Sequence, residues 1–219
     1  MRSRDADRFN HDPWAEAYDE RVRDETNPIR AGYAELLDWT VKQARIAPDS
    51  VVLDLGAGTG NTAARIAAAG RVVGVDVSAK MLARAPAKLA HLPDVELVRA
   101  DLLEVFDRPL PAFDAVVSTY SVHHLDADEK AQLFRLVYAA LRPGGRAVFG
   151  DLMFESEAAR EAIAAAWTDA ERTQTLISVE EEYPWRLDRS LEDLEAAGLA
   201  VLATKRFSTL SWGIATERP

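Results

Sequence analysis

The sequence predicts an α/β fold in which a mostly parallel sheet carries helices on both faces. Short runs of β-branched residues alternate with helical patterns between residues 51 and 150, and the first run ends in a glycine-rich turn. Such alternation is typical of a parallel sheet, because each helix returns the chain to the same edge. At 219 residues, the chain has the size of one domain, so we expect a single domain over residues 1–219.

Residues 1–47, ahead of the sheet, predict an N-terminal helical cap. Asp12-Pro13 precedes an apolar stripe that contains Tyr18, and Asn27-Pro28 precedes a second apolar stripe. Proline at the first helical position, after a capping Asp or Asn, is a strong signal for the start of a helix. We therefore expect two helices that begin at these two pairs.

Residues 51–151 predict a core of five strands joined by helices. The helix after the fourth strand begins at Asp126, which forms a capping-box pattern with Glu129, and Pro143-Gly144-Gly145 ends it. The expected strands are Val51–Leu55, Arg71–Val75, Val95–Ala100, Phe113–Ser118 and Arg146–Gly150.

Two smaller parts follow the core. Residues 152–187 have helical character and contain Trp167, Tyr183 and Trp185. We interpret this part as a candidate cap whose aromatic residues line a pocket, although aromatic residues most often pack in a core. Residues 188–219 predict a closing helix, from Ser190 to Gly198, and an antiparallel hairpin of strands at 199–207 and 210–216.

The composition excludes several classes of site and partner. Lys and Arg total 26 against 36 Asp and Glu, which gives a net charge of −10 and disfavours nucleic acids and anionic membranes as partners. The absence of cysteine excludes disulfides, thiolate metal sites and cysteine nucleophiles. No apolar stretch approaches the roughly 18 residues of a membrane span, and the N-terminus lacks an apolar signal region. We expect a cytoplasmic protein.

The most informative segment is the glycine-rich turn after the first strand. Gly56, Gly58 and Gly60 alternate with other residues, directly after the strand that contains Asp54. Glycine permits a tight turn and a close approach of a ligand to the backbone, and the following N–H groups can bind it. An ordinary strand-to-helix turn rarely needs three alternate glycines, so the pattern indicates a cofactor loop.

Three aspartates extend this signal across the predicted sheet. Asp54, Asp76 and Asp101 each lie at the carboxyl end of successive strands, and those ends border the ligand crevice of an open α/β sheet. Asp76 also suits the ribose of a dinucleotide. Three carboxylates nevertheless disfavour a pyrophosphate and favour a cation. S-adenosylmethionine (SAM) carries a sulfonium and an ammonium group but no phosphate.

In order along residues 51–151, the motifs resemble those of class I SAM-dependent methyltransferases. The Ser118–Leu125 loop is similar to that of small-molecule methyltransferases, and the Asn/Asp-Pro-Pro-aromatic motif of amino-group DNA methyltransferases is missing there. The resemblance implies a Rossmann-like, seven-stranded, mostly parallel sheet with a terminal antiparallel hairpin, SAM as cofactor and S-adenosylhomocysteine as product. Its motifs are Val52–Gly60, Asp76, Ala100–Leu102, Phe113–Ser118 with His123–Leu125, and Leu141–Gly145.

The resemblance also implies a role for each matched position. The glycine loop would surround the methionine part, with Asp54 near its amino group. Asp76 would accept both ribose hydroxyls, and Asp101 would accept the adenine amino group. The complete expected cofactor set is Asp54, Gly56, Ala57, Gly58, Gly60, Asp76, Val77, Met81, Asp101, Leu102 and Ser118.

Candidates for catalysis are His123, His124 and Tyr18. The two histidines follow the fourth strand, where a methyl acceptor would lie, and a histidine can act as a general base. Because adjacent residues do not face one point, we expect at most one of them to be catalytic. Tyr18 could contact the sulfonium through its ring or belong to the buried face of a helix. We expect no metal, because His123, His124 and Asp126 lack a further ligand.

The function predicted from the sequence is methyl transfer from SAM to a small or medium organic acceptor by in-line displacement. The part at 152–187 would then cap the acceptor. Three alternatives stay open: a nicotinamide-dependent oxidoreductase with the same fold, a SAM-binding sensor or partner module without turnover, and a methyltransferase acting on RNA or protein. The acceptor, its reacting atom and the oligomeric state are not assigned.

Overall fold

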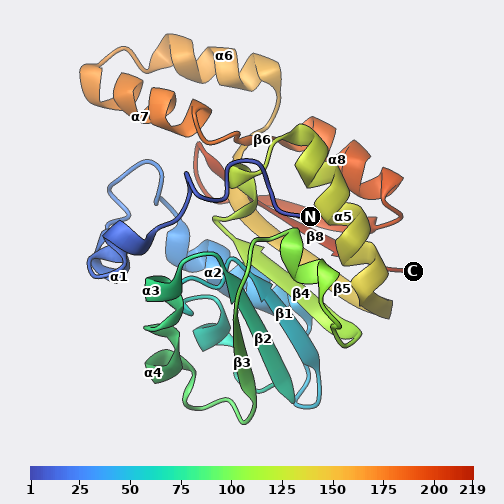
Figure 1. The fold of residues 1–219 in the computed structure, drawn as a ribbon. Helices are drawn as coiled ribbons and strands as arrows, with labels where there is room; N and C mark the ends of the chain where they lie inside the picture. The colour runs from blue at the N-terminus through green and yellow to red at the C-terminus, as the bar shows by residue number, and fades with distance from the viewer.

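A computed structural model describes residues 1–219 and confirms the predicted α/β architecture (Figure 1). Seven strands lie in the order β3-β2-β1-β4-β5-β8-β7, and an eighth, β6, pairs with β5 beside them. β8 runs antiparallel to β5 and β7, whereas the other pairs are parallel. The strands are β1 (Val51–Leu55), β2 (Arg71–Asp76), β3 (Val95–Arg99), β4 (Phe113–Thr119), β5 (Leu141–Phe154), β6 (Trp185–Arg186), β7 (Ala200–Arg206) and β8 (Ser211–Glu217).

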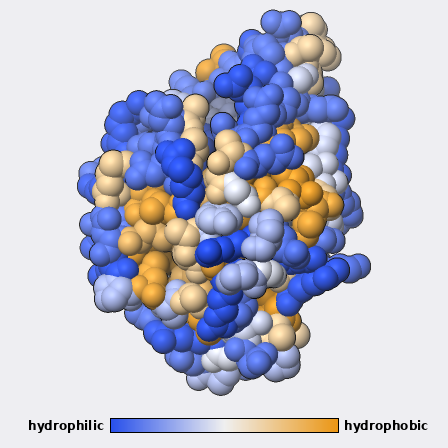
Figure 2. Space-filling view, turned by 90° about the vertical axis from the view of Figure 1, so that its right-hand side faces the viewer, coloured by the Kyte–Doolittle hydropathy of each residue, from blue (hydrophilic) through white to orange (hydrophobic).

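Helices cover both faces of the sheet. The α-helices are α1 (Tyr18–Arg21), α2 (Tyr33–Ala44), α3 (Ala79–Leu82), α4 (Ala85–Leu89), α5 (Ala127–Ala140), α6 (Glu157–Ala166), α7 (Ala170–Glu180) and α8 (Leu187–Ala196). Four 3₁₀ turns accompany them: η1 (Asp12–Trp14), η2 (Ala63–Arg65), η3 (Glu104–Asp107) and η4 (Val122–His124). No helix is both long and apolar enough to span a bilayer, and the face in Figure 2 is mainly hydrophilic with separate apolar patches.

The alternation of side chains along the strands divides the core into two layers. Leu53 and Leu55 of β1 belong to the layer under α5 and α8, whereas Val52 belongs to the layer under α2 and α4. Successive strand residues point to opposite faces, so Asp54 lies on the same side as Val52. The sheet therefore buries apolar side chains on both faces, as parallel sheets do.

The predicted start of α5 is confirmed, and its cap is complete. The Asp126 carboxylate accepts the backbone N–H of Glu129 at 2.9 Å, while the Glu129 carboxylate accepts the backbone N–H of Asp126 at 3.0 Å. The helix ends at Ala140, just before Pro143 and Gly144. This reciprocal pair satisfies two backbone N–H groups at the start of the helix. It also fixes the direction in which the chain leaves the loop after β4.

The N-terminal helices differ from the prediction. The Asp12-Pro13 pair opens only the 3₁₀ turn η1, and α2 begins at Tyr33 rather than at Pro28. The Asn27 side chain accepts the N–H of Ile29 at 2.9 Å, which makes a local turn instead of a helix cap. The Asp12 carboxylate accepts the N–H of Lys80 at 2.9 Å. The expected cap side chains therefore serve other contacts.

The part predicted as a cap over residues 152–187 begins with strand, not helix. β5 continues to Phe154, because Leu152 pairs with Ser211 of β8 and Met153 pairs with Trp185 of β6. Beyond β5, α6 and α7 project together past the end of the sheet (Figure 1). α8 begins at Leu187, three residues before the predicted Ser190, and Gly198 follows it in the left-handed conformation with φ 93°.

Candidate active site

A cavity of about 160 Å³ lies at the carboxyl ends of the central strands. Loops after β1, β2, β3 and β4 meet there, together with the N-terminal residues and Glu182 of the α7–β6 connection. Of the residues predicted from the sequence, those that line it are Gly56, Gly58, Asp76, Val77, Met81, Asp101, Leu102, Tyr18, His123 and His124. Ten of the fourteen residues predicted for the cofactor and for catalysis are thus brought to one place.

Four expected residues do not line this cavity. Ala57 lines a smaller adjoining cavity of about 20 Å³. Ser118 is buried and donates its hydroxyl to the Leu55 carbonyl at 2.8 Å, which ties β4 to β1. A Cβ at Gly60 would lie 3.2 Å from Ala85 Cβ, so Gly60 lets α4 pack against the loop. Asp54 is buried behind the loop.

The glycine loop has the backbone conformation that its sequence predicts. Gly56 and Gly58 have φ values of 75° and 53°, which side chains other than glycine rarely adopt. A Cβ on Gly56 would lie 2.0 Å from Ser121 Oγ, so the loop after β4 also requires glycine there. The Gly58 N–H donates to Asp76 Oδ2 at 2.8 Å. The loop and the end of β2 are thereby fixed to each other.

Asp76 and Asp54 form an acidic pair on either side of this loop. Asp76 Oδ1 accepts the N–H of Ser78 at 2.8 Å, and burial raises the pKa of Asp76 despite its two backbone donors. Neither carboxylate oxygen of Asp54 has a hydrogen-bond partner. Burial, assisted by the charge of Asp76, raises the pKa of Asp54 to about 7. An orphaned buried carboxylate is suited to an ammonium group.

Asp101 combines a local turn with a contact to the N-terminal segment. Its Oδ1 accepts the N–H groups of Leu103 at 3.0 Å and of Ser3 at 2.9 Å, and its Oδ2 accepts the Ser3 hydroxyl. Its bond to the N–H two residues ahead makes a local turn at the end of β3. Because Asp101 also lines the cavity, Ser3 lies at the place where the sequence predicts the adenine.

Residues 1–14, which we call the N-terminal arm, cover the cavity. Besides Ser3 on Asp101, the Asp12 carboxylate accepts the Ser78 hydroxyl at 2.6 Å, and the Phe9 ring stacks on His124 with centroids 4.2 Å apart. Arg4 donates to the Tyr183 hydroxyl at 3.0 Å. The arm therefore connects the loops after β2, β3 and β4 with the α7–β6 connection.

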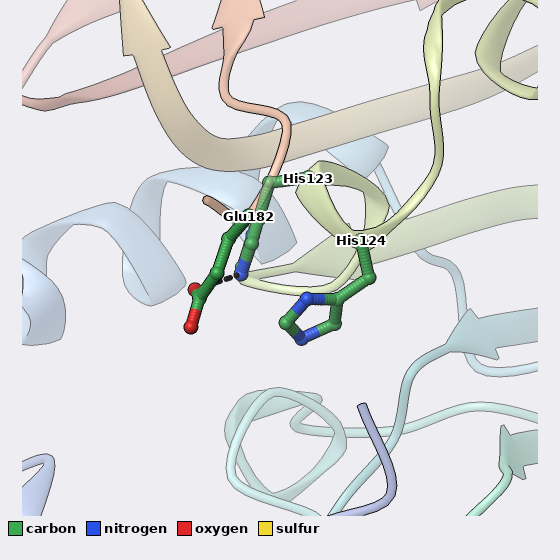
Figure 3. Close-up of side chains that lie close together, drawn as sticks. All are labelled: His123, His124 and Glu182. Atoms are coloured by element: carbon green, nitrogen blue, oxygen red, sulfur yellow. Dashed lines mark ion pairs between the residues drawn. The ribbon is translucent and has the colours of Figure 1, made fainter. Parts of the chain in front are cut away.

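The two histidines of η4 both line the cavity, which differs from the expectation that adjacent residues diverge. The rings lie 4.1 Å apart at 57°, because the Asp151 carboxylate holds one through its Nδ1 and Phe9 stacks on the other. His123 Nε2 lies 3.3 Å from Glu182 Oε2 (Figure 3).

The surroundings give these histidines opposite charge states. Burial lowers the pKa of His123, but Asp151 and Glu182 outweigh it and raise that pKa to about 9. Burial and the neighbouring His123 lower the pKa of His124 well below its usual value. His124 Nδ1 is buried without a hydrogen-bond partner. His123 therefore holds a proton more readily than an ordinary histidine, and His124 holds one less readily.

Tyr18 and Arg30 form the wall between the glycine loop and the histidines. Tyr18 is buried to an extent that raises the pKa of its hydroxyl. The Arg30 guanidinium lies 5.9 Å from the Tyr18 ring centroid and 4.8 Å from that of Tyr120. Its Nη1 is buried and has no hydrogen-bond partner. From the sequence, Arg30 could hold the cofactor carboxylate or be a surface arginine on a helix, and the structure places it in the lining of the cavity.

The aromatic residues expected to line the site from residues 152–187 lie elsewhere. Trp185 is 1% exposed and packs between Phe134 and Phe149 in the core. Tyr183 holds the arm through Arg4, and Trp167 packs beside the core cluster under α6 and α7. The pocket interpretation is therefore wrong for all three. Glu182, an acidic neighbour without a recognisable motif, is the residue that reaches the cavity.

Comparison with known proteins identifies the family. The methyltransferase domain model matches residues 52–145. An uncharacterised methyltransferase of Anoxybacillus flavithermus is 36% identical over 156 residues, covering 69% of this chain and 70% of the relative. One from Geobacillus kaustophilus is 35% identical over 158 residues and covers 70% of each chain. The chain belongs to the class I SAM-dependent methyltransferase family.

Solved structures agree with this methyltransferase fold. The N-methyltransferase NodS from Bradyrhizobium japonicum, in complex with S-adenosylhomocysteine, superposes with a TM-score of 0.64 at 17% identity and covers 96% of this chain and 94% of its own. The [4+2]-cyclase SpnF also gives 0.64 at 17% identity, with coverages of 84% and 81%. At these identities the likeness shows the fold alone.

The methyltransferase transfers a methyl group from SAM. Membership of this family argues against the two alternatives of a nicotinamide-dependent oxidoreductase and a SAM-binding module without turnover. The residues present fit the cofactor, since the buried carboxylate of Asp54, which has no hydrogen-bond partner, suits the ammonium group of SAM.

Proposed function

We propose that this methyltransferase acts on a small or medium organic acceptor, bound in the cavity between the glycine loop and the histidines. The observation that carries the proposal is the enclosure of this cavity by the N-terminal arm, through Ser3 and Phe9. With the arm in place, about 160 Å³ is free between the glycine loop and the histidines, which favours a small acceptor over a polymer. The net charge of −10 further disfavours RNA.

The cofactor roles follow the positions that the resemblance implies. Asp76 would accept the ribose hydroxyls, since its carboxylate lines the cavity and is fixed by Gly58 and Ser78. Asp54 would face the ammonium group, with Gly56, Ala57, Gly58 and Gly60 shaping the loop beside it. Val77, Met81 and Leu102 would flank the adenine, and Asp101 would bind its amino group after Ser3 moves. Ser118 supports the loop from β4 rather than touching the ligand.

We add Arg30 to this set as the partner of the cofactor carboxylate. Its Nη1 is buried and unpartnered, and the tyrosine rings of Tyr18, Tyr33 and Tyr120 surround the guanidinium within 5.9 Å. An arginine without a counterion in such a place favours a ligand carboxylate. Tyr18 then acts by orienting Arg30 and by presenting its ring face to the methyl-bearing end of the cavity.

Catalysis in this arrangement depends on positioning. SAM supplies the methyl group, which passes to the acceptor by in-line displacement. Once the N-terminal arm has moved to admit them, the chain would hold both ligands side by side, where proximity and exclusion of water lower the barrier. His123 is held by Asp151 and Glu182 and orients the loop. Neutral His124 faces the cavity and is able to accept the proton of an acceptor that arrives protonated.

A screen of acceptors tests the proposal. The purified chain is incubated with SAM and, separately, with pooled small hydroxyl, amine, thiol and carbon-acid compounds, with bulk RNA and with unfolded protein, while the release of S-adenosylhomocysteine is measured. We expect release with one small-molecule pool only. Methylation of RNA or protein alone would contradict the proposal. A cytoplasmic location stays a prediction from the sequence.

A further inference from the structure

A cluster of three potential metal ligands lies at the acceptor end of the cavity. The ligand atoms of His123, His124 and Glu182 all lie within 4.8 Å of one another, and Figure 3 shows the two rings and the carboxylate converging from η4 and the α7–β6 connection. The sequence prediction of no metal rested on the absence of a further ligand beside His123, His124 and Asp126. The fold supplies that ligand from 58 residues further along the chain.

We propose that His123, His124 and Glu182 bind a divalent transition-metal ion of the zinc class. Two histidines and one carboxylate are a donor set of catalytic zinc sites, which leave a further position open. Ligand atoms about 2.1 Å from a tetrahedral ion are roughly 3.4 Å apart. The 3.3 Å between His123 Nε2 and Glu182 Oε2 has this spacing, and the His124 ligand atom lies within 4.8 Å of both.

The surroundings of the cluster are those of a built site. The Asp151 carboxylate contacts His123 Nδ1 and also accepts the His123 backbone N–H at 3.0 Å. Nδ1 therefore keeps its proton towards Asp151, and Nε2, which gives up its own proton on binding, is directed at the ion, as in carboxylate–histidine–metal triads. Buried Nδ1 of His124 has no hydrogen-bond partner. An ion pair between His123 and Glu182 alone leaves that nitrogen unexplained.

A lysine joins the two segments that carry the ligands. Lys130 is buried, and its ammonium group donates to the Tyr183 carbonyl at 2.7 Å and to the Leu125 carbonyl. Tyr183 directly follows Glu182, and Leu125 directly follows His124. The ligands are therefore held in place by their backbone neighbours, which reduces the entropy lost when the ion binds.

The open position of the ion faces the cavity, and this assigns a class of acceptor. Resting here on the proposed function, we infer that the acceptor binds through a hydroxyl or phenol oxygen. The bound oxygen loses its proton to solvent, because a metal ion lowers the pKa of such a group. The O–CH₃ bond then forms as the S–CH₃ bond breaks, and the electron pair of that bond stays on the sulfur. His124 serves as a ligand rather than as the base.

Titration with Co²⁺, which gives a visible spectrum at nitrogen and oxygen ligands, tests the metal site. The full chain, freed of any affinity tag and of metal, is compared with His124→Ala, Glu182→Gln and the control His91→Ala, whose ring bonds the Ile66 carbonyl. We expect one Co²⁺ per chain in the wild type and the control, and loss of the spectrum in the two site variants. Asp151→Asn is expected to weaken binding about 10- to 100-fold.

SAM affinity, measured by calorimetry in each variant, separates this proposal from the function. If the wild type binds SAM but not Co²⁺, or if both site variants keep the spectrum, the metal site is refuted and the proposed function stands. If the site variants lose SAM binding as well, the Co²⁺ titration of Asp151→Asn decides. Weakened Co²⁺ binding in Asp151→Asn supports the metal site, and unchanged binding refutes it. A catechol or 2-hydroxy acid that alters the Co²⁺ spectrum supports the oxygen acceptor, and an unchanged spectrum with every such compound refutes it.

Discussion

Replacing Asp54 with asparagine should make the cofactor-free methyltransferase more stable. Burial and Asp76 raise the pKa of Asp54 from 3.8 to about 7, which corresponds to a cost of about 4 kcal/mol for ionising it in the folded state. When folding raises the pKa of an acid, the contribution of that acid to stability is fully present at a pH below its pKa in the unfolded chain. The contribution is lost as the pH rises through its pKa in the folded state, here about 7. At pH 8, Asp54→Asn removes that cost without changing the shape of the side chain.

Urea unfolding at several pH values measures this effect. We expect the free energy of unfolding of Asp54→Asn to exceed that of the wild type by up to about 4 kcal/mol at pH 8, and the difference to shrink as the pH approaches 5. The control is Asp114→Asn, near the start of β4 and so at the end of the strands away from the cavity. The Asp114 carboxylate accepts the Val51 N–H there at 2.7 Å. That variant should lose stability at every pH.

Cofactor binding gives a second measure of the same residue. An ammonium group beside Asp54 favours the ionised carboxylate, so the wild type should release a proton on binding SAM near pH 7. Calorimetry in two buffers of different ionisation enthalpy detects this release. Asp54→Asn should abolish the release and lower the affinity for SAM. Reduced stability at pH 8 together with unchanged proton release would refute the reasoning.

Three further predictions concern the cofactor and the core. Asp76→Ala removes two hydrogen bonds to the cofactor of about 1.5–3 kcal/mol each. Its Kd for SAM, measured by calorimetry, should therefore rise at least about 100-fold. The control Asp114→Ala should leave that Kd unchanged. Arg30→Met should bind SAM and decarboxylated SAM equally, while the wild type prefers SAM; a preserved preference contradicts the carboxylate role. Trp185→Ala should cost about 3–5 kcal/mol of unfolding free energy with little change in SAM affinity at low temperature.

The parts of the fold that local patterns determine could be predicted from the sequence. The glycine loop requires positive φ at Gly56 and Gly58, and only glycine adopts it without cost. The capping box of Asp126 and Glu129 needs only four consecutive residues. The alternation of strands and helices then places Asp76 at the cavity, because the ends of parallel strands meet at one edge of the sheet.

Features that depend on distant segments could not be predicted in this way. β5 extends to Phe154 because β8 and β6 supply partners from further along the chain. Asn27-Pro28 favours a helix start locally, yet the Asn27 side chain makes a turn with Ile29. Glu182 lies at the cavity, where Lys130 of the distant helix α5 holds the carbonyl of the following residue. No local pattern distinguishes these outcomes from their alternatives.

The covering of the cavity by the N-terminal arm has a kinetic consequence. Ligand sites of cofactor size enclose about 300–1,000 Å³, whereas this cavity measures about 160 Å³, so the form described here is too small for SAM and acceptor together. Entry therefore draws on an open population in which Ser3 has left Asp101. The observed affinity is the intrinsic affinity multiplied by the fraction of open molecules, and turnover cannot exceed the rate of opening. Substitutions in the arm, remote from the transferred methyl, will thus tune how fast the methyltransferase works.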